Sequence, residues 1–410
     1  MYAVFKPSEA CGSITAPPSK SMAHRLLICA GLADGESVIR NLAFSDDVSA
    51  TIACLRSLGA DIRLDGNTAY VKGVDVHKKL GAPATLPCNE CGSTLRFFIP
   101  ICLLSGEKRI LSGTEYLMNR PLSVYETIAS EQEITFVRDK TSLTVSGILQ
   151  SGVYEVAGDI SSQFISGLLF ALPLLDGDSE LRLLPPVESK PYIDMTLSAL
   201  SHFGIEIDQC GNSYRVKGGQ KYRPCDTFVE GDYSNAAFFE ALNVAGGRVN
   251  VDGLREDSAQ GDKIYTNYIE NIRGKNLPMG LSDCPDLGPV MFSVAAMLGG
   301  ARFVGTKRLR IKESDRIAAM QEELAKLGVM LTADEDSVTV NPGVLRMPDV
   351  PLDGHGDHRI VMALSVLLTV TGGVIEGAEH VNKSFPDFFE KLQELGIEVQ
   401  LCNGSATPEY

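Results

Sequence analysis

A recurring helix start constrains the fold of this chain more than any other feature. Six times, a short polar or charged segment leads directly into an apolar stretch of helix length that ends at a glycine. Their spacing defines a unit of roughly 70 residues, which is too long for a solenoid repeat. The openings are PSKSMAHR from Pro18, CGSTLR from Cys91, GDISSQF from Gly158, GDYSNAAF from Gly231, PDLGPV from Pro285 and GDHRIV from Gly356.

Each unit continues with the same order of patterns. A strand-like run follows the glycine, and then come a polar loop, a second helix pattern, another glycine and alternating strands. The clearest joints are LGADIRL at 58–64, FGIEI at 203–207, LGVMLTA at 327–333 and LGIEV at 395–399. Many α/β proteins show such punctuation, but the similar register of the joints favours a true repeat. The fourth unit is degenerate near 264–281. With three units in each lobe, the six units predict two lobes of about 200 residues each.

The helix starts predict binding of anions. Ser, Asp and Gly are N-cap residues, and the N–H groups of a first turn, together with the helix dipole, favour anions. Cations recur at these starts and in nearby loops, although any one of them would more often be a solvated surface charge. They are Lys20, Arg25, Arg96, Arg120, Lys312, Arg316, His358, Arg359 and Lys383. If the starts converge, the protein is suited to hold phosphates and carboxylates.

The acidic composition limits the partners. A formal net charge of −15 argues against nucleic acid and anionic membranes, which require a basic surface, but not against small anionic ligands. The longest apolar runs, 164–175 and 360–370, fall short of a membrane span of about 20 residues. The first residues show no signal-peptide pattern, and the ten cysteines lack the spacing of a secreted disulfide framework. We therefore expect a soluble cytoplasmic protein with reduced thiols.

Two clusters suggest other chemistry. Cys88 and Cys91 form a CxxC pair at a predicted helix start, where a thiolate would be stabilised as in dithiol oxidoreductases. No second pair exists for a structural zinc, and the surrounding pattern is not the expected βαβ redox unit. His355, Asp357 and His358 could begin a metal site, but it would need further ligands that six histidines in total barely supply.

The charged run KRLRIKESDR at 307–316 has two interpretations. By default it is a solvated helix start. However, Lys312, Glu313 and Arg316 are spaced so that their charged groups can meet near one helix end. This arrangement also suits an anion site that contains an acid or a base.

Eight segments, in this order, resemble the 5-enolpyruvylshikimate-3-phosphate synthase family, and the match spans essentially the whole chain. They are PSKSMAHR, GSTLRF, MNRPLSV, DISSQF, ESKPYIDMT, IKESDR, GDHR and NKSFPDFFEKL. The resemblance implies an α/β fold of two lobes, each made of three βαβαββ repeats in an inside-out α/β barrel. Residues 15–228 would form the first lobe and residues 1–14 plus 229–410 the second. The active site would lie in the cleft between the lobes, which closes on substrate.

The resemblance also implies a reaction. Members of this family transfer the enolpyruvyl group of phosphoenolpyruvate to the 5-hydroxyl of shikimate 3-phosphate and release phosphate, through a tetrahedral intermediate. They use neither a metal nor an organic cofactor, and a monomer is expected. The attacking hydroxyl needs a base, and the methylene carbon needs a proton that elimination later removes. Asp286 is the candidate for the hydroxyl, Glu313 for the methylene carbon, and Lys20 is a competing proton carrier.

The binding residues implied by the resemblance follow from the same motifs. Shikimate 3-phosphate would contact Lys20, Ser21, Arg25, Ser161, Ser162, Gln163, Ser189, Tyr192, Asp286 and Lys312. Phosphoenolpyruvate would contact Lys20, Gly92, Arg96, Arg120, Gln163, Arg316, His358, Arg359 and Lys383. The cations would stabilise the charge that develops on the departing phosphate.

The chain departs from the family pattern at several positions. Glu90 and Cys91 stand where many members have Asn-Ala, Phe97 replaces a frequent proline, and Arg308 stands where some members have asparagine. Glu90 could weaken anion binding unless a cation such as Arg120 neutralises it.

Two other functions stay open at this point. The sister transferase that acts on UDP-N-acetylglucosamine shares the fold, but it carries a reactive cysteine in the loop that reads YLMNRP here, at 116–121. A non-catalytic sugar-phosphate binding protein on the same scaffold would not need both Asp286 and Glu313 among the cations.

Overall fold

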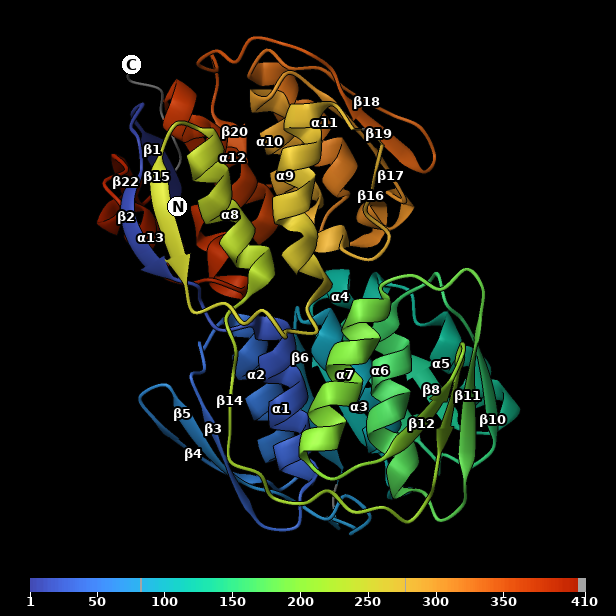
Figure 1. The fold of residues 1–410 in the computed structure, drawn as a ribbon. Helices are drawn as coiled ribbons and strands as arrows, with labels where there is room; N and C mark the ends of the chain where they lie inside the picture. Colours follow the sequence, from blue (N-terminus) through green and yellow to red (C-terminus); the bar gives the residue numbers. More distant parts are fainter. Residues whose placement is uncertain (82, 277, 405–410) are drawn as a thin grey trace. The chain divides into compact units, whose positions relative to one another are not determined.

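The computed structural model describes residues 1–81, 83–276 and 278–404, and the chain separates into two compact units (Figure 1). Unit 1 comprises Met1–Pro17 and Gly231–Tyr410, and unit 2 comprises Pro18–Glu230. Against the expected first lobe, 15–228, unit 2 begins three residues later and ends two residues later. The reason at the first crossing is local, because the amide of Ala16 still donates to Asp252 O inside unit 1.

Unit 2 contains three four-stranded sheets of one design. Their strand orders are β14-β3-β5-β4, β6-β7-β9-β8 and β10-β11-β13-β12. In each sheet the first two strands are parallel and the other pairs are antiparallel, as three βαβαββ repeats require. The first sheet takes its outer strand from the far end of the unit, because β14 pairs with β3.

The strands of unit 2 are β3 (Glu36–Arg40), β4 (Asp61–Asp65), β5 (Thr68–Lys72), β6 (Ala84–Asn89), β7 (Arg109–Gly113), β8 (Thr135–Arg138), β9 (Ser142–Ser146), β10 (Val153–Ala157), β11 (Ser179–Leu184), β12 (Ile207–Cys210), β13 (Ser213–Val216) and β14 (Thr227–Phe228). Its helices are α1 (Lys20–Leu32), α2 (Asp46–Ser57), α3 (Gly92–Cys102), α4 (Glu115–Asn119), α5 (Ser123–Glu131), α6 (Ser162–Ala171) and α7 (Lys190–His202), with a 3-10 turn at Leu172–Leu174.

Unit 1 repeats the design less completely. Two of its sheets have four strands, in the orders β16-β17-β19-β18 and β20-β21-β1-β22, whereas β15 pairs only with β2 among the described residues. The degenerate fourth unit predicted near 264–281 is confirmed by this two-stranded sheet. The N-terminal strand β1 lies between β21 and β22 and pairs with both in antiparallel fashion.

The strands of unit 1 are β1 (Tyr2–Phe5), β2 (Cys11–Thr15), β15 (Arg248–Asp252), β16 (Met279–Gly280), β17 (Ala301–Val304), β18 (Leu331–Ala333), β19 (Ser337–Val340), β20 (Leu352–Asp353), β21 (Gly373–Glu376) and β22 (Val399–Cys402). Its α-helices are α8 (Tyr233–Val244), α9 (Tyr265–Gly274), α10 (Gly288–Met297), α11 (Arg316–Lys326), α12 (His358–Thr371) and α13 (Phe388–Glu394). Its 3-10 turns are η2 (Gly261–Ile264), η3 (Pro285–Leu287), η4 (Lys307–Ile311) and η5 (Ala378–Lys383).

The apolar stretches behind the helix starts form the centre of each unit. In α1 every residue from Met22 to Leu32 is buried, and in α12 every residue from His358 to Thr369 is buried. A helix that is apolar all round must be enclosed. Accordingly, α3 packs on α6 and α1 packs on α7, while the sheets lie outside them (Figure 1). This is the inside-out α/β arrangement that the family resemblance implies.

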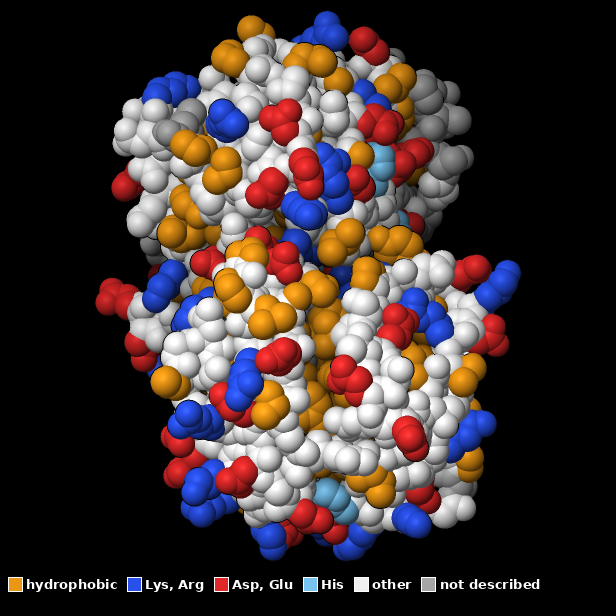
Figure 2. All heavy atoms as spheres, turned by 90° about the vertical axis from the view of Figure 1, so that its right-hand side faces the viewer, with side chains coloured by type: hydrophobic (Ala, Val, Ile, Leu, Met, Phe, Trp, Pro, Cys, Tyr) orange, Lys and Arg blue, Asp and Glu red, His pale blue; other side chains and the backbone are white. Residues whose placement is uncertain are grey.

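The surface agrees with the acidic composition. Acidic and basic side chains of the described residues are interspersed over most of the face seen in Figure 2. Within the described residues, no helix combines the length and the apolar character that a bilayer span requires.

Candidate active site

Arg25 connects the starts of α1 and α7 in unit 2. Its Nε donates to Thr196 Oγ1 at 2.8 Å, and its two terminal nitrogens donate to Ser21 O at 2.6 Å and Tyr192 O at 2.9 Å. Burial lowers the pKa of Arg25 to about 10, so the guanidinium stays charged at neutral pH. Three predicted ligands of one substrate are therefore held together.

A second set of contacts joins the first turns of α3 and α6. Arg96 Nη1 donates to Gln163 Oε1 at 2.6 Å, and Gln163 Nε2 donates to Ser93 Oγ at 2.9 Å. Ser161 caps α6 by accepting from the amide of Gln163, and Ser162 is buried at the first position of the helix. These predicted residues therefore form one helix start that Arg96 braces.

Ser189 precedes α7 in an unusual backbone conformation. Its φ is +54°, in the left-handed region, and the residue is 2% exposed. Residues other than glycine seldom adopt this region, and those that do concentrate at ligand sites. The conformation supports the binding role that the sequence predicts for this serine.

Gly92 begins α3 against two guanidinium groups. A Cβ atom there would lie 2.5 Å from Arg120 Nη1 and 3.5 Å from Arg96 Nη1. Nonbonded heavy atoms pack best at about 3.5–4.0 Å. A residue without a side chain is therefore what lets Arg120, which is 8% exposed, lie against this helix start.

Lys20 is paired with a carboxylate that the sequence analysis did not single out. Its Nζ lies 2.8 Å from Oδ2 of Asp47, in the first turn of α2. Ser45 caps that helix. The segment FSDDVSA thus carries a signal for a helix start, but nothing in it points to Lys20 as a partner.

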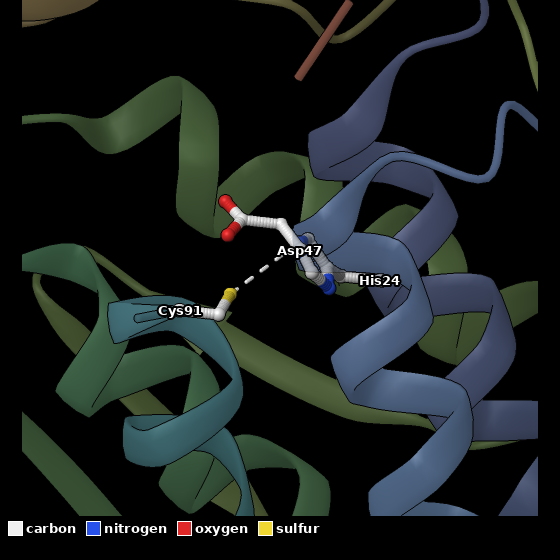
Figure 3. Close-up of side chains that lie close together, drawn as sticks. All are labelled: His24, Asp47 and Cys91. Atoms are coloured by element: carbon white, nitrogen blue, oxygen red, sulfur yellow. Dashed lines mark hydrogen bonds between the residues drawn. The ribbon is translucent and has the colours of Figure 1, made fainter. Parts of the chain in front are cut away.

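His24 and Cys91 lie close to Asp47 (Figure 3). Nδ1 of His24 is 2.7 Å from Thr51 Oγ1, and its Nε2 is 3.9 Å from Cys91 Sγ. Burial lowers the pKa of His24 to about 3 and raises the pKa of the Cys91 thiol to about 12. A CxxC redox pair needs a stabilised thiolate, whereas both cysteines of this motif are buried. The redox interpretation of the motif is therefore wrong.

The other departures from the family pattern have local explanations. Phe97 is 1% exposed and packs edge-on against Phe170, with ring centroids 5.4 Å apart, so it is a core residue. Arg308 donates from Nη2 to Ser282 O at 2.5 Å. Glu90 is exposed.

In unit 1, Arg316 is the centre of an ion-pair network. Its guanidinium donates to Asp286 Oδ1 at 3.0 Å, to Glu313 Oε2 at 2.9 Å and to Asp357 Oδ2 at 2.8 Å. The residue is 1% exposed. Burial alone would lower its pKa, but the three carboxylates outweigh burial and raise the pKa above its ordinary value. The default interpretation of a solvated helix start is therefore wrong for this part of the run.

Asp286 links this network to two further cations. Lys312 Nζ lies 3.5 Å from Asp286 Oδ1, and Arg359 Nη2 lies 3.1 Å from Asp286 Oδ2. Arg359 also donates to Ser234 Oγ at 2.9 Å, a contact that the sequence analysis missed. Burial lowers the pKa of Lys312 to about 8, with Asp286 opposing the shift. Five predicted residues of unit 1 are thus in one contact network.

Asp357, which the sequence analysis weighed as one member of a disfavoured metal site, has a structural role. It is fully buried, caps α12 by accepting from the amide of Arg359, and holds Arg316. His355 instead pairs with Glu323, with Nε2 2.9 Å from Oε1. In the part of the chain that the structure describes, the potential metal-ligand groups do not include His355, Asp357 and His358 together.

The two remaining predicted residues of unit 1 are also buried. His358 is in the first turn of α12, 1% exposed, with Nδ1 3.6 Å from Asp357 Oδ1. Lys383 is the last residue of η5 and is 8% exposed.

The His355–Glu323 pair predicts a pH dependence of stability. The hydrogen bond to Glu323 raises the pKa of His355 above its ordinary value of about 6.5. The stabilisation is therefore complete below about pH 6.5 and is lost as the pH rises through the folded-state pKa. We expect the difference in thermal midpoint between the parent protein and His355→Gln to be largest in mild acid and to shrink in mild alkali. The exposed His202→Gln is the control, and a difference independent of pH would contradict this assignment.

Comparison with known proteins gives consistent matches. The family model of EPSP synthase (3-phosphoshikimate 1-carboxyvinyltransferase) matches residues 4–392. The 3-phosphoshikimate 1-carboxyvinyltransferase of Clostridium botulinum is 41% identical over 419 residues, covering 95% of this chain and 96% of that protein. That of Clostridium kluyveri is 39% identical over 422 residues, covering 97% and 98%.

Solved structures share the fold. EPSP synthase from Acinetobacter baumannii superposes with a TM-score of 0.79 at 22% identity, covering 98% of this chain and 100% of that one. The enolpyruvyl transferase NikO from Streptomyces tendae gives 0.76 at 15% identity, covering 97% and 98%. At these identities the likeness concerns the fold alone.

Proposed function

The chain belongs to the EPSP synthase family, and from this premise we propose how its residues carry out 3-phosphoshikimate 1-carboxyvinyl transfer. The enzyme is a transferase of the shikimate pathway, which leads to chorismate and the aromatic amino acids. It moves the enolpyruvyl group of phosphoenolpyruvate to the 5-hydroxyl of shikimate 3-phosphate and releases phosphate. The family match over residues 4–392 carries this conclusion.

The shikimate 3-phosphate site is assigned mainly to unit 2. We assign the 3-phosphate to Ser161, Ser162 and Ser189, three hydroxyls at the starts of α6 and α7, where helix N-termini favour anions. Arg25 and Tyr192 belong to the same site, and the contact between them supports this. The residues assigned to the site are Lys20, Ser21, Arg25, Ser161, Ser162, Gln163, Ser189, Tyr192, Asp286 and Lys312.

Phosphoenolpyruvate carries a phosphate and a carboxylate, so its site needs several cations. Arg316 and Arg359 are positioned by Asp286, and Arg120 lies against Gly92. The full set is Lys20, Gly92, Arg96, Arg120, Gln163, Arg316, His358, Arg359 and Lys383. Because these residues come from both units, we propose that the reaction takes place where the substrates bridge them.

Two carboxylates among these cations provide the proton transfers. Asp286 accepts the proton of the attacking 5-hydroxyl, and Glu313 gives a proton to the methylene carbon and takes it back on elimination. Both contact the same guanidinium, that of Arg316, within 3.0 Å. This shared arginine is the observation that supports an acid–base role, since simple anion binding would not require two carboxylates.

Phosphate release tests the proposal directly. The purified protein is incubated with shikimate 3-phosphate and phosphoenolpyruvate, and we expect phosphate to form only when both are present. The rate should be unchanged by a chelator, because no step uses a metal. Release with UDP-N-acetylglucosamine instead, or binding without turnover, would favour the sister transferase or a binding protein.

The position of Gly92 gives a second prediction. We expect Gly92→Ala to push the Arg120 guanidinium away and to raise the KM for phosphoenolpyruvate by about tenfold or more, since a charge-assisted contact is worth roughly 1.5–3 kcal/mol. Shikimate 3-phosphate affinity should change little. Gly280→Ala is the matched control, because a Cβ there meets no atom within 4 Å. Equal KM values for the two variants would contradict the role of Arg120.

We further propose that the enzyme works as a cytoplasmic monomer without a cofactor. The ten cysteines are all free thiols, which fits a reducing compartment. Sedimentation at equilibrium over a range of concentrations tests the monomer, and a mass that rises with concentration would contradict it.

A further inference from the structure

Three buried side chains with metal-binding chemistry meet in unit 2 (Figure 3). His24 comes from α1, Asp47 from α2, and Cys91 from the position that caps α3. One ligand atom of each lies within 4.8 Å of the other two. Imidazole, thiolate and carboxylate are the three ligand types that Zn²⁺ takes in proteins.

The imidazole and the thiol are already oriented toward each other. His24 Nε2 lies 3.9 Å from Cys91 Sγ, whereas two ligands of one tetrahedral zinc ion, with bonds of about 2.0–2.3 Å, lie about 3.5 Å apart. Thr51 Oγ1 contacts the other ring nitrogen at 2.7 Å and is itself 2.8 Å from Thr94 Oγ1. Such outer contacts fix the direction of a ligand imidazole.

The carboxylate of Asp47 forms an ion pair with the ammonium of Lys20. Lys20 Nζ is 2.8 Å from Asp47 Oδ2, and the Lys20 side chain is 15% exposed against 7% for that of Asp47. A cation that enters here must compete with Lys20 for the same carboxylate. It would enter by displacing Lys20, the more exposed of the two side chains.

We propose that His24, Asp47 and Cys91 form an inhibitory site for a thiophilic divalent cation such as Zn²⁺ or Cd²⁺, which displaces Lys20 from Asp47. The Cys91 thiol releases its proton to solvent as the bond from sulfur to the ion forms, and His24 Nε2 and an Asp47 oxygen complete the protein ligands. No electron is transferred. The inhibition rests on the proposed function of Lys20, but binding of the ion does not.

Cadmium is the probe, because a thiolate bound to it absorbs in the ultraviolet. The reduced full chain is titrated with Cd²⁺ and followed by absorption and by calorimetry. We expect one thiolate-bound ion per chain and inhibition in proportion to occupancy. Cys91→Ser should abolish the absorption while keeping an oxygen that can cap α3. Cys102→Ser, at a buried cysteine of the same helix, should leave it intact.

Two further variants test the ligand set and the competition. His24→Gln should keep the absorption but weaken binding by more than about tenfold, since loss of even an outer contact to a ligand costs roughly 10–100-fold. Lys20→Met removes the competing ammonium, so Cd²⁺ no longer has to displace Lys20 from Asp47. This variant should therefore bind Cd²⁺ at least about tenfold more tightly than the parent protein. The group of Glu322, Glu323 and His355 contains no sulfur, so binding there gives no such absorption.

The outcomes separate this site from the proposed function. No thiolate absorption in the parent protein, or absorption that survives Cys91→Ser, would overturn the site. Unchanged affinity in Lys20→Met would overturn displacement. Thiolate-bound Cd²⁺ without inhibition would overturn the inhibitory role, whereas failure of phosphate release in the absence of any added metal would count against the function of the enzyme alone.

Discussion

Glu313→Gln is expected to lower turnover by about 10²–10⁴-fold, the range for loss of a general acid or base. Glutamine keeps the size of the side chain and can still accept the hydrogen bond that Arg316 Nη2 donates at 2.9 Å. It cannot exchange a proton with the methylene carbon. Steady-state kinetics with both substrates is the measurement.

Binding of shikimate 3-phosphate provides the control for this variant. Its assigned contacts lie with residues such as Arg25 and Ser161, so its affinity, measured by direct titration, should stay close to that of the parent. Lys383→Ala gives a contrast, because loss of a charge-assisted contact should raise the KM for phosphoenolpyruvate more than it lowers turnover. If Glu313→Gln turned over at the parental rate, Glu313 would serve only as an ion-pair partner of Arg316. The proton transfers would then have to be assigned to Asp286 and Lys20.

Arg316→Met is expected to destabilise unit 1 by about 3–5 kcal/mol, because it leaves a buried carboxylate without its cation. Asp357 is fully buried, and its Oδ2 accepts from Arg316 Nε at 2.8 Å. The same change removes the contact to Glu313 and one of those to Asp286. Native-state hydrogen exchange of α11 and α12 reports the local free energy of opening.

Arg310→Met is the matched control for that experiment. Arg310 lies in the same charged run, but its pair with Asp315, at 3.5 Å, is exposed on both sides. Exposed pairs of this kind contribute about 0–1 kcal/mol. Equal losses of protection in the two variants would mean that the Arg316 network does not stabilise the unit.

The helix starts and the repeat could be predicted from the sequence because their signals are local. An N-cap residue, an apolar stretch and a terminal glycine all lie within the length of one helix. Their regular recurrence stays recognisable even where single residues differ between repeats. The degenerate fourth unit was visible for the same reason, since its missing strands leave no alternating pattern near 264–281.

The partners of the site cations could not be predicted in this way. Asp47 is 27 residues from Lys20, on the second helix of the same repeat, and Asp357 is 41 residues from Arg316, at the start of the next repeat. Each pair therefore meets only through tertiary packing. A carboxylate at a helix start looks like a cap whether or not it also holds a cation. The CxxC hypothesis failed for a related reason, because its local spacing carries no information on the burial that keeps Cys91 protonated.

The positions of β14 and β1 in their sheets set an order for assembly during synthesis. Unit 2 has all its strands once Phe228 has left the ribosome, because β14 completes the sheet of β3. Unit 1 must wait for β22, since β1 at Tyr2–Phe5 pairs with strands that end at Glu376 and Cys402. At synthesis rates of about 5–20 residues per second, β1 stays unpaired for roughly 10–30 s after unit 2 can close. For that time β1 is an unpaired strand edge, which makes a partly folded chain prone to aggregation.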